Sequence, residues 1–174
     1  MNPAFSEPFS FAQVAGYVAF VLGVSAFLQR NDRRLKILNA LQGLVYAVHF
    51  FLLGNLSAAG SALVCGARSG SAAFVSARWP VVPFVAANLA VGFLVAHSAQ
   101  DWLPVAGFSV GTVSVFLLRG IPLRAGMFAS SALVVVAAWL SGSIGGVALE
   151  SSICTANAIT ALRLMRARRT PSAD

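Results

Sequence analysis

VSAFLQR, residues 24–30, recurs in this 174-residue chain as VSVFLLR, residues 113–119. The same offset of 89 residues, kept without gaps, also brings Cys65 onto Cys154. Apolar segments match by chance more often than polar ones, but a heptapeptide and a cysteine pair at one offset indicate an internal duplication. The sequence therefore predicts two similar units, one after the other along the chain.

The composition around these segments is that of a membrane protein. Hydrophobic residues make up 58% of the chain, charged residues make up 10%, and the mean hydropathy is +0.81. A soluble domain carries about 25% charged residues, so this chain has too little polar surface to cover a globule in water. The lipid bilayer is therefore the first partner that the sequence implies.

Seven apolar segments approach the length that crosses a bilayer, which is roughly 17–25 helical residues. Charges, prolines and clusters of Gly, Ser and Asn separate them. The expected spans are 9–29, 35–53, 57–77, 81–97, 102–119, 124–140 and 144–163. The predicted fold is an all-α membrane protein with seven transmembrane helices.

The duplication groups these spans as three, one and three. The expected parts are a first three-helix repeat (1–78), a linker helix (79–100), a second three-helix repeat (101–165) and a basic cytoplasmic tail (166–174). Because the linker span turns the chain around once more, the two repeats run parallel. Parallel repeats of this kind occur in transporters whose sites lie near the midplane, at the repeat interface.

Basic residues gather at one end of the expected spans and set the orientation. They are Arg30, Arg33, Arg34, Lys36, Arg78, Arg119, Arg124, Arg163, Arg166, Arg168 and Arg169. The other end carries Glu7 and Asp101 and neither Lys nor Arg. Since cytoplasmic loops are enriched in Lys and Arg, the N-terminus is expected outside and the C-terminus in the cytoplasm of a multi-pass plasma-membrane protein. The clusters lie between apolar runs, so the net charge of +7 predicts topology rather than nucleic-acid binding.

Polar side chains inside the expected spans mark a candidate solute site. One helix face of the third span carries Ser61, Cys65, Arg68 and Ser71. At the repeat offset, the seventh span carries Glu150, Cys154, Asn157 and Thr160. A charge at the bilayer centre costs ~2.5–3.5 kcal/mol and normally faces a cavity or a partner. The predicted substrate-binding residues are therefore Arg68, Asn157, Ser61, Ser71 and Thr160.

Two roles stay open for the charged residues inside the spans. Arg68 contacts a polar or anionic solute while Glu150 balances charge or titrates, or the two form a structural pair. His49 is a further candidate for coupling, although a lone histidine at that position is more often a packing residue. Metal-ligand spacings and catalytic motifs are missing from the sequence, so it predicts no enzyme, no metal and no cofactor.

Several segments of the first three spans resemble a known family. AQVAGY (12–17), LQRNDRRLK (28–36) and LQGLVYAVHF (41–50) are similar to the YgjV family of bacterial inner-membrane proteins. This resemblance implies a location in the inner membrane more than an activity. The three-plus-one-plus-three layout is in turn similar to the SWEET sugar transporters and the PnuC transporters.

The resemblance to SWEET-type proteins has implications for particular residues. In those proteins a mid-membrane Asn on the third helix of each repeat lines the solute site. Asn157 stands at such a position, and Arg68 replaces its counterpart in the first repeat. The Pro-Gln pair of PQ-loop proteins is missing from both repeats, which argues against carrying over their hinge.

Together these features predict a transporter of a small polar solute, with an anion favoured by Arg68, that works by alternating access between the repeats. The alternative is a membrane receptor or assembly factor that binds a peptide or protein partner without transport. Gly66 and Gly70 form a GxxxG pattern, which is typical of close helix contact within a repeat or of a homo-oligomer face.

Overall fold

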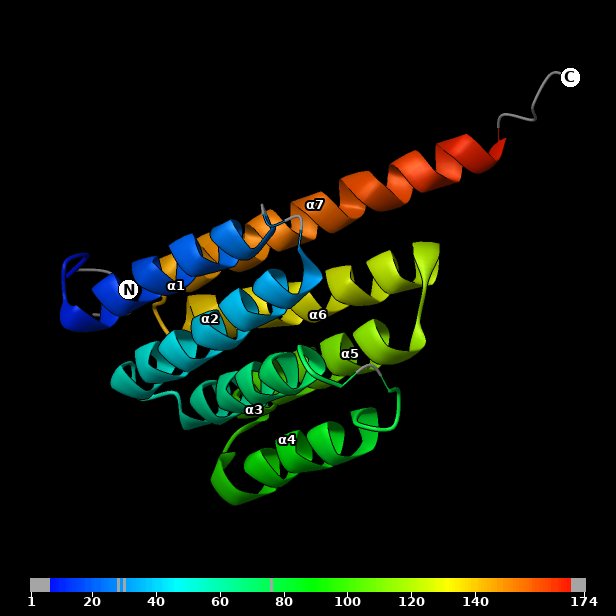
Figure 1. Ribbon diagram of the computed structural model, residues 1–174. Helices are drawn as coiled ribbons and strands as arrows, with labels where there is room; N and C mark the ends of the chain where they lie inside the picture. Colours follow the sequence, from blue (N-terminus) through cyan, green and yellow to red (C-terminus); the bar gives the residue numbers. More distant parts are fainter. Residues whose placement is uncertain (1–6, 28, 30, 76, 170–174) are drawn as a thin grey trace, which may run out of the picture.

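The computed structural model describes residues 7–27, 29, 31–75 and 77–169. Within these residues the chain forms α1 (Phe11–Phe27), α2 (Asp32–Leu52), α3 (Leu56–Ala72), α4 (Val81–Val95), the short 3₁₀ helix η2 (Ala99–Asp101), α5 (Trp102–Leu117), α6 (Gly120–Leu140) and α7 (Ile144–Arg169). Successive α-helices run antiparallel in one bundle (Figure 1). The predicted all-α class is confirmed, and each expected span overlaps one helix, although α2 and α6 begin before their spans and α7 ends after its span.

Helices α2 and α6 lie at the centres of two groups of three. Helix α2 packs against α1 and α3, and α6 packs against α5 and α7. Contacts of α1 with α7 and of α3 with α5 close the two groups into one bundle. Helix α4 packs outside them, against α3 and α5, and the last turns of α7 extend beyond the other helices (Figure 1).

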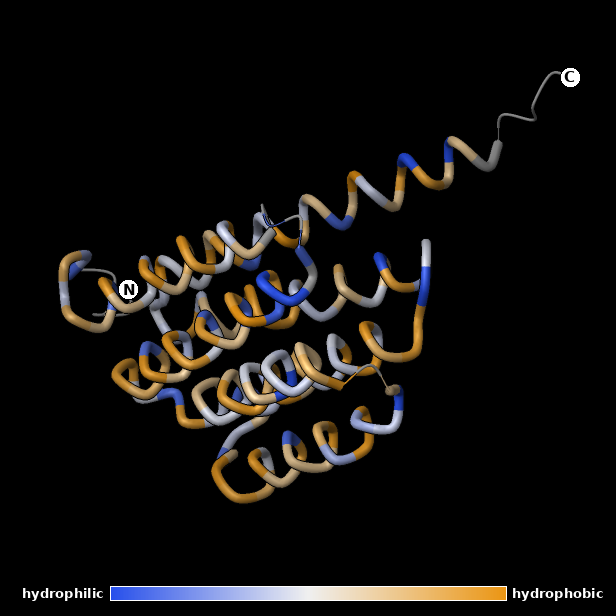
Figure 2. Tube along the Cα trace, viewed as in Figure 1, coloured by the Kyte–Doolittle hydropathy of each residue, from blue (hydrophilic) through white to orange (hydrophobic). Residues whose placement is uncertain are grey.

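The distribution of polar side chains is the inverse of that in a soluble protein. The buried polar side chains are Gln13, His49, Ser57, Ser61, Ser69, Asn88, Thr112, Ser114, Ser130, Ser131, Ser143, Glu150 and Asn157. One face of α2 instead exposes large apolar residues at helical spacing, namely Ile37, Leu41, Leu44, Val48 and Phe51. Figure 2 shows apolar segments on every helix. A contiguous apolar surface of this extent suits lipid rather than water.

Length and hydropathy alone single out fewer membrane spans than the pattern of charges does. Among the described helices, Arg33–Leu52 and Gly120–Leu140 are long and apolar enough to cross a bilayer individually. Phe11–Ala26 and Val81–Val95 are apolar but shorter. Small and polar residues lower the hydropathy of α3, where several of them are buried, and of α7, whose last turns carry exposed arginines.

The α2–α3 and α6–α7 hairpins share one construction, 88 residues apart. Gly54 and Gly142 occupy the same place in the two turns, with φ of 78° and 71°, a conformation that glycine adopts without steric cost. The side chains of Asn55 and Ser143 then cap α3 and α7, each accepting a hydrogen bond from the amide three residues further on, at 2.8 Å and 2.9 Å. These matches relate the two hairpins residue by residue.

The offset of 89 residues expected for these helices is therefore wrong. At 88 residues, Cys65 corresponds to Ile153 rather than Cys154, and Arg68 corresponds to Ala156 rather than Asn157. The physical reason is that the offset changes along the chain: the recurring heptapeptides lie 89 residues apart, whereas the starts of α2 and α6, at Asp32 and Gly120, lie 88 residues apart. A register slip of one residue rotates a helix position by about 100°, so the predicted stripe on α7 does not mirror the one on α3.

The structure also bears on two smaller expectations, the extent of the C-terminal tail and the role of the GxxxG pattern. Residues 166–169 continue α7 as helix instead of beginning a tail, and residues 170–174 lie outside the described residues, as does Arg30. Gly66 packs inside the bundle, since a Cβ added at Gly43 would lie 2.6 Å from the Gly66 Cα atom. This glycine therefore serves the contact between α2 and α3.

Candidate solute site

A cavity of about 110 Å³ lies between the two groups of three helices. All six of those helices line it, and α4 does not. Its polar lining residues are Asn39, Gln42, Tyr46, Cys65, Arg68, Ser69, Ser130, Ser131 and Glu150. Because about 10–15 Å³ of such a cavity is enough to hold one water molecule, the cavity has room for several waters or one small solute.

Arg68 brings a cation into this cavity from α3. Its Nη1 donates to Thr112 Oγ1 at 3.4 Å and its Nη2 donates to Cys65 Sγ at 3.2 Å. Both bonds are weak, the first because it is long and the second because a thiol is a poor acceptor. Among the described residues no carboxylate lies within 4.0 Å of the guanidinium. Most of its donors are therefore available to a solute.

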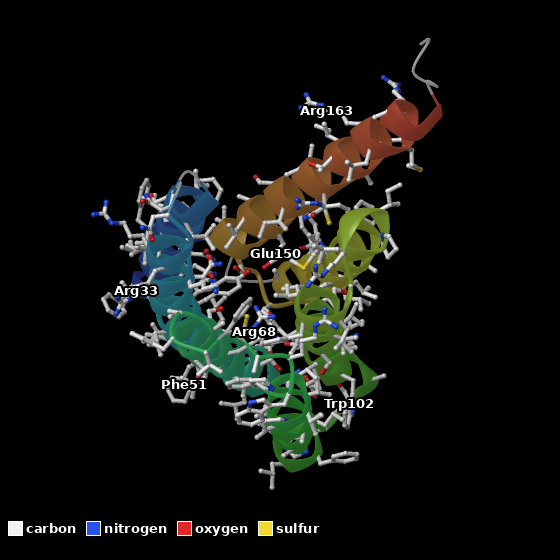
Figure 3. All side chains as sticks on the ribbon, turned by 45° about the vertical axis from the view of Figure 1, so that its right-hand side comes forward. Arg33, Phe51, Arg68, Trp102, Glu150 and Arg163 are labelled. Atoms are coloured by element: carbon white, nitrogen blue, oxygen red, sulfur yellow. The ribbon has the colours of Figure 1, made fainter. Side chains whose placement is uncertain are left out.

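Glu150 brings a carboxyl group into the same cavity from α7. Its side chain is 7% exposed, and the Ser131 hydroxyl on α6 donates a hydrogen bond to the carboxylate. Figure 3 shows Glu150 and Arg68 in the interior between the helix groups, while Arg33, Phe51 and Arg163 point away from it. Glu150 and Arg68 both line the cavity, but they do not form a direct ion pair.

The other predicted substrate-binding residues do not line the cavity. Asn157 is 5% exposed and accepts a hydrogen bond from Arg124 Nη1 at 3.3 Å. Ser61 is fully buried, Ser71 is exposed, and the Thr160 hydroxyl donates to the carbonyl four residues earlier at 2.7 Å. Of the residues predicted to bind a solute, the structure therefore places Arg68 at the cavity.

His49 ties three helices together instead of facing the cavity. Its Nδ1 lies 2.6 Å from the Ala12 carbonyl oxygen and its Nε2 lies 2.6 Å from Ser143 Oγ. Since a carbonyl oxygen only accepts, Nδ1 carries the proton, and in the neutral ring Nε2 accepts from the serine hydroxyl. His49 thereby links α1 and α2 to the start of α7.

Two more side chains of the first helix group reach the same turn between α6 and α7. Gln13 donates from Nε2 to the Gly142 carbonyl at 2.6 Å and accepts from the Ile144 amide at 3.1 Å. Asn55 donates from Nδ2 to Ser141 Oγ at 2.7 Å. We call Gln13, His49 and Asn55 the turn clamp.

The comparisons with known proteins identify the family. Residues 10–168 match the family described as Bacterial inner membrane protein, Imp-YgjV. The chain belongs to this family. It is 31% identical over 158 residues to Inner membrane protein YgjV of Escherichia coli (strain K12), an alignment that covers 91% of this chain and 86% of that protein. No solved structure matches the chain.

Membership in the Imp-YgjV family confirms the resemblance that the first three spans indicated. It also makes the protein a bacterial inner-membrane protein, so the apolar outer surface of the bundle lies against lipid. The cavity between the helix groups is therefore enclosed by a membrane-embedded bundle.

Sequence reasoning missed most of the polar cavity lining of this family member. Asn39, Gln42 and Tyr46 follow one face of α2 at i, i+3 and i+7, and this spacing is the signal that could have found them. The Tyr46 hydroxyl is buried without a hydrogen-bond partner. Ser130 and Ser131 give no such signal, because serine is common in apolar helices.

The cavity offers few ligands for a metal ion. Over the described part of the chain, groups of three His, Cys, Asp or Glu side chains are not found. Cys65 and Cys154 are free thiols. The chemistry at hand is therefore hydrogen bonding and charge, supplied mainly by Arg68 and Glu150.

Proposed function

We propose that the protein transports a small polar solute across the inner membrane, with an anion as the favoured class, by alternating access between the helix groups α1–α3 and α5–α7. The observation that carries this proposal is the Arg68 guanidinium, which faces the cavity without a carboxylate partner. A cation held inside a membrane bundle is costly unless it meets a cavity or a counter-charge. A solute that supplies the counter-charge would remove that cost.

The proposed topology has seven membrane crossings, with the N-terminus outside and the C-terminus in the cytoplasm. Supporting it, the basic residues lie where the odd-numbered helices end and the even-numbered helices begin, for example Arg33 in α2 and Arg163 in α7. Glu7 and Asp101 belong to the opposite end. The peripheral position of α4 supports two three-helix repeats joined by a linker, a layout similar to that of SWEET-type transporters.

We also propose that the cavity binds its solute without transforming it. A catalytic site needs a nucleophile within hydrogen-bond reach of a base. The cavity offers Ser131 beside Glu150, but no third side chain is described that orients Glu150 as a base for this serine. Binding of opposite charges is the simpler use of these groups.

The test uses Cys65, which lies 3.2 Å from Arg68 Nη2 and lines the cavity. In a Cys154→Ser background, Cys65 is labelled with an anionic and with a cationic methanethiosulfonate of similar size. We expect the anionic reagent to react faster, because the uncompensated guanidinium attracts it. The preference should vanish in Arg68→Gln and persist in Arg163→Gln, a matched change at an exposed position.

The same variants are then compared in proteoliposomes for flux of radiolabelled acetate, lactate, sulfate and glycine. Flux of at least one solute that Arg68→Gln abolishes and Arg163→Gln preserves supports transport. Equal labelling by both reagents together with no flux above empty vesicles would overturn the proposal.

The second candidate function is a membrane receptor or assembly factor. The observation that favours it is an apolar groove of about 480 Å³ on the outside of α2, α3 and α4, lined in part by Leu44, Phe51, Leu56, Leu63 and Val95. A membrane partner with an apolar helix would suit such a groove. A stable complex that Phe51→Ser disrupts, in a protein that shows no flux, would favour this function over transport.

A further inference from the structure

The central cavity holds two opposite charges that do not neutralise each other. Arg68 and Glu150 are the charged residues of its lining, and they stand on α3 and α7, in different helix groups. The partners described for each are neutral: Thr112 and Cys65 for the guanidinium and Ser131 for the carboxylate. Each ion thus has hydrogen bonds but lacks a counter-charge within 4.0 Å among the described residues.

An isolated charge in a low-dielectric interior is unfavourable unless it is paired and hydrogen-bonded. A purely anionic solute would pair with Arg68 but would add a second negative charge to the cavity that holds Glu150. A purely cationic solute would do the reverse. A solute with one anionic and one cationic group pairs with Arg68 and with Glu150 at the same time.

The remaining lining supplies the hydrogen bonds that such a solute needs. Tyr46 lines the cavity, and its hydroxyl is buried without a hydrogen-bond partner. Asn39 and Gln42 line the same wall from α2. The volume of about 110 Å³ is below the ~300–1,000 Å³ of pockets that hold drug-sized ligands, which favours a small solute.

We propose that the cavity binds a small zwitterion, with its acidic group on Arg68 and its cationic group on Glu150. This inference rests on the proposed function, since it takes the cavity to be the solute site. It narrows the solute class from small polar solutes to those that carry both charges on a short carbon skeleton.

The first experiment uses the native protein and needs no variant. Binding of glycine, β-alanine and γ-aminobutyrate is measured in nanodiscs by titration calorimetry, beside acetate and methylammonium as single-charge analogues. We expect one of the amino acids to bind about tenfold or more tightly than both analogues, the effect of one further charge-assisted hydrogen bond. The three amino acids differ in charge separation, so the preferred one reports the spacing of the two walls.

The second experiment exchanges the charges one at a time. Glu150→Gln should abolish the preference for the amino acid over acetate, and Arg68→Gln should abolish its preference over methylammonium. Arg163→Gln, far from the cavity, should change neither ratio. Glu150→Asp keeps the carboxyl group and should retain a preference for a zwitterion. If Glu150→Asp also loses the preference, the loss in Glu150→Gln comes from misfolding and not from the missing charge.

The outcomes separate this inference from the proposed function. Acetate binding as tightly as every amino acid, with a ratio unchanged in Glu150→Gln, would overturn the zwitterion and leave anion transport standing. Absence of binding for all five solutes, together with absence of flux for acetate, lactate, sulfate and glycine, would overturn both.

Discussion

The two ends of the cavity are held together in different ways. At the turn between α6 and α7, the turn clamp joins the two helix groups through hydrogen bonds of 2.6–3.1 Å. Among the side chains that line the cavity, the bond that crosses between the groups is the one from Arg68 to Thr112, at 3.4 Å. Among the described side chains, several short hydrogen bonds therefore join the two helix groups at the α6–α7 turn, whereas near Arg68 one long hydrogen bond joins them.

Backbone packing reinforces this difference. A Cβ added at Gly145 in α7 would lie 2.5 Å from the carbonyl carbon and oxygen of Gly16 in α1. The two helices thus touch backbone to backbone beside the turn clamp. The comparison teaches that a transporter built this way would open first at the Arg68 end, because fewer favourable contacts are lost there.

The largest effect is expected from removing the centre of the clamp. His49→Ala should lower the free energy of unfolding by about 3 kcal/mol, because it deletes a fully buried ring and two short hydrogen bonds. The shift is measured as the change in thermal unfolding in one detergent. His97→Ala, at an exposed site, should leave the midpoint unchanged, and an equal shift in both variants would refute the role given to His49.

A somewhat smaller loss of stability is expected when a side chain is added where α1 and α7 are in backbone contact. Gly145→Ala should destabilise the protein by about 2 kcal/mol, since its Cβ would meet backbone atoms that are unable to move aside. Hydrogen exchange should rise at the start of α7. In Gly70→Ala the new Cβ would lie 3.6 Å from the Ala40 Cβ atom, an ordinary contact, so that variant should be as stable as the native protein.

Two helix caps allow a matched comparison between the ends. Asn31 caps α2 by accepting from the Arg33 and Arg34 amides, whereas Asn55 caps α3 and also bonds to Ser141. Loss of a cap costs about 1 kcal/mol, and Asn55→Ala should cost roughly 1 kcal/mol more than Asn31→Ala because it also removes the cross-group bond. Equal shifts in thermal unfolding would show that the Asn55–Ser141 bond contributes nothing.

The smallest effect is expected at the other end of the cavity. Thr112→Val keeps the shape of the side chain and removes the oxygen that accepts from Arg68. Because that bond is 3.4 Å long, the free energy of unfolding should fall by less than about 0.5 kcal/mol. Alkylation of the Cys65 thiol should become faster in this variant. A loss of unfolding free energy as large as that in His49→Ala would show that the two ends of the cavity are held together equally strongly.

Much of the fold can be predicted from the sequence, because it depends on the hydropathy and charge of whole segments and not on single side chains. Low charge, long apolar segments and alternating basic clusters predicted an all-α membrane bundle without any knowledge of contacts, and the resemblance of three segments in the first spans indicated the YgjV family. Arg68 was predicted to face a cavity or a partner, because a charge inside an apolar helix is conspicuous in the sequence, and it does line the central cavity.

The tertiary structure decided the parts that depend on rotation and register. The duplication was visible in the sequence, but its offset slipped by one residue between the helices, and that slip wrongly equated Arg68 with Asn157. Only the packed helices show that Asn157 faces Arg124, that His49 fastens the α6–α7 turn, and that Glu150 shares the cavity with Arg68. The composition of a segment does not change when its alignment shifts by one residue. The direction in which a helical side chain points changes by about 100°, so only the packing of the helices determines which residues line the cavity.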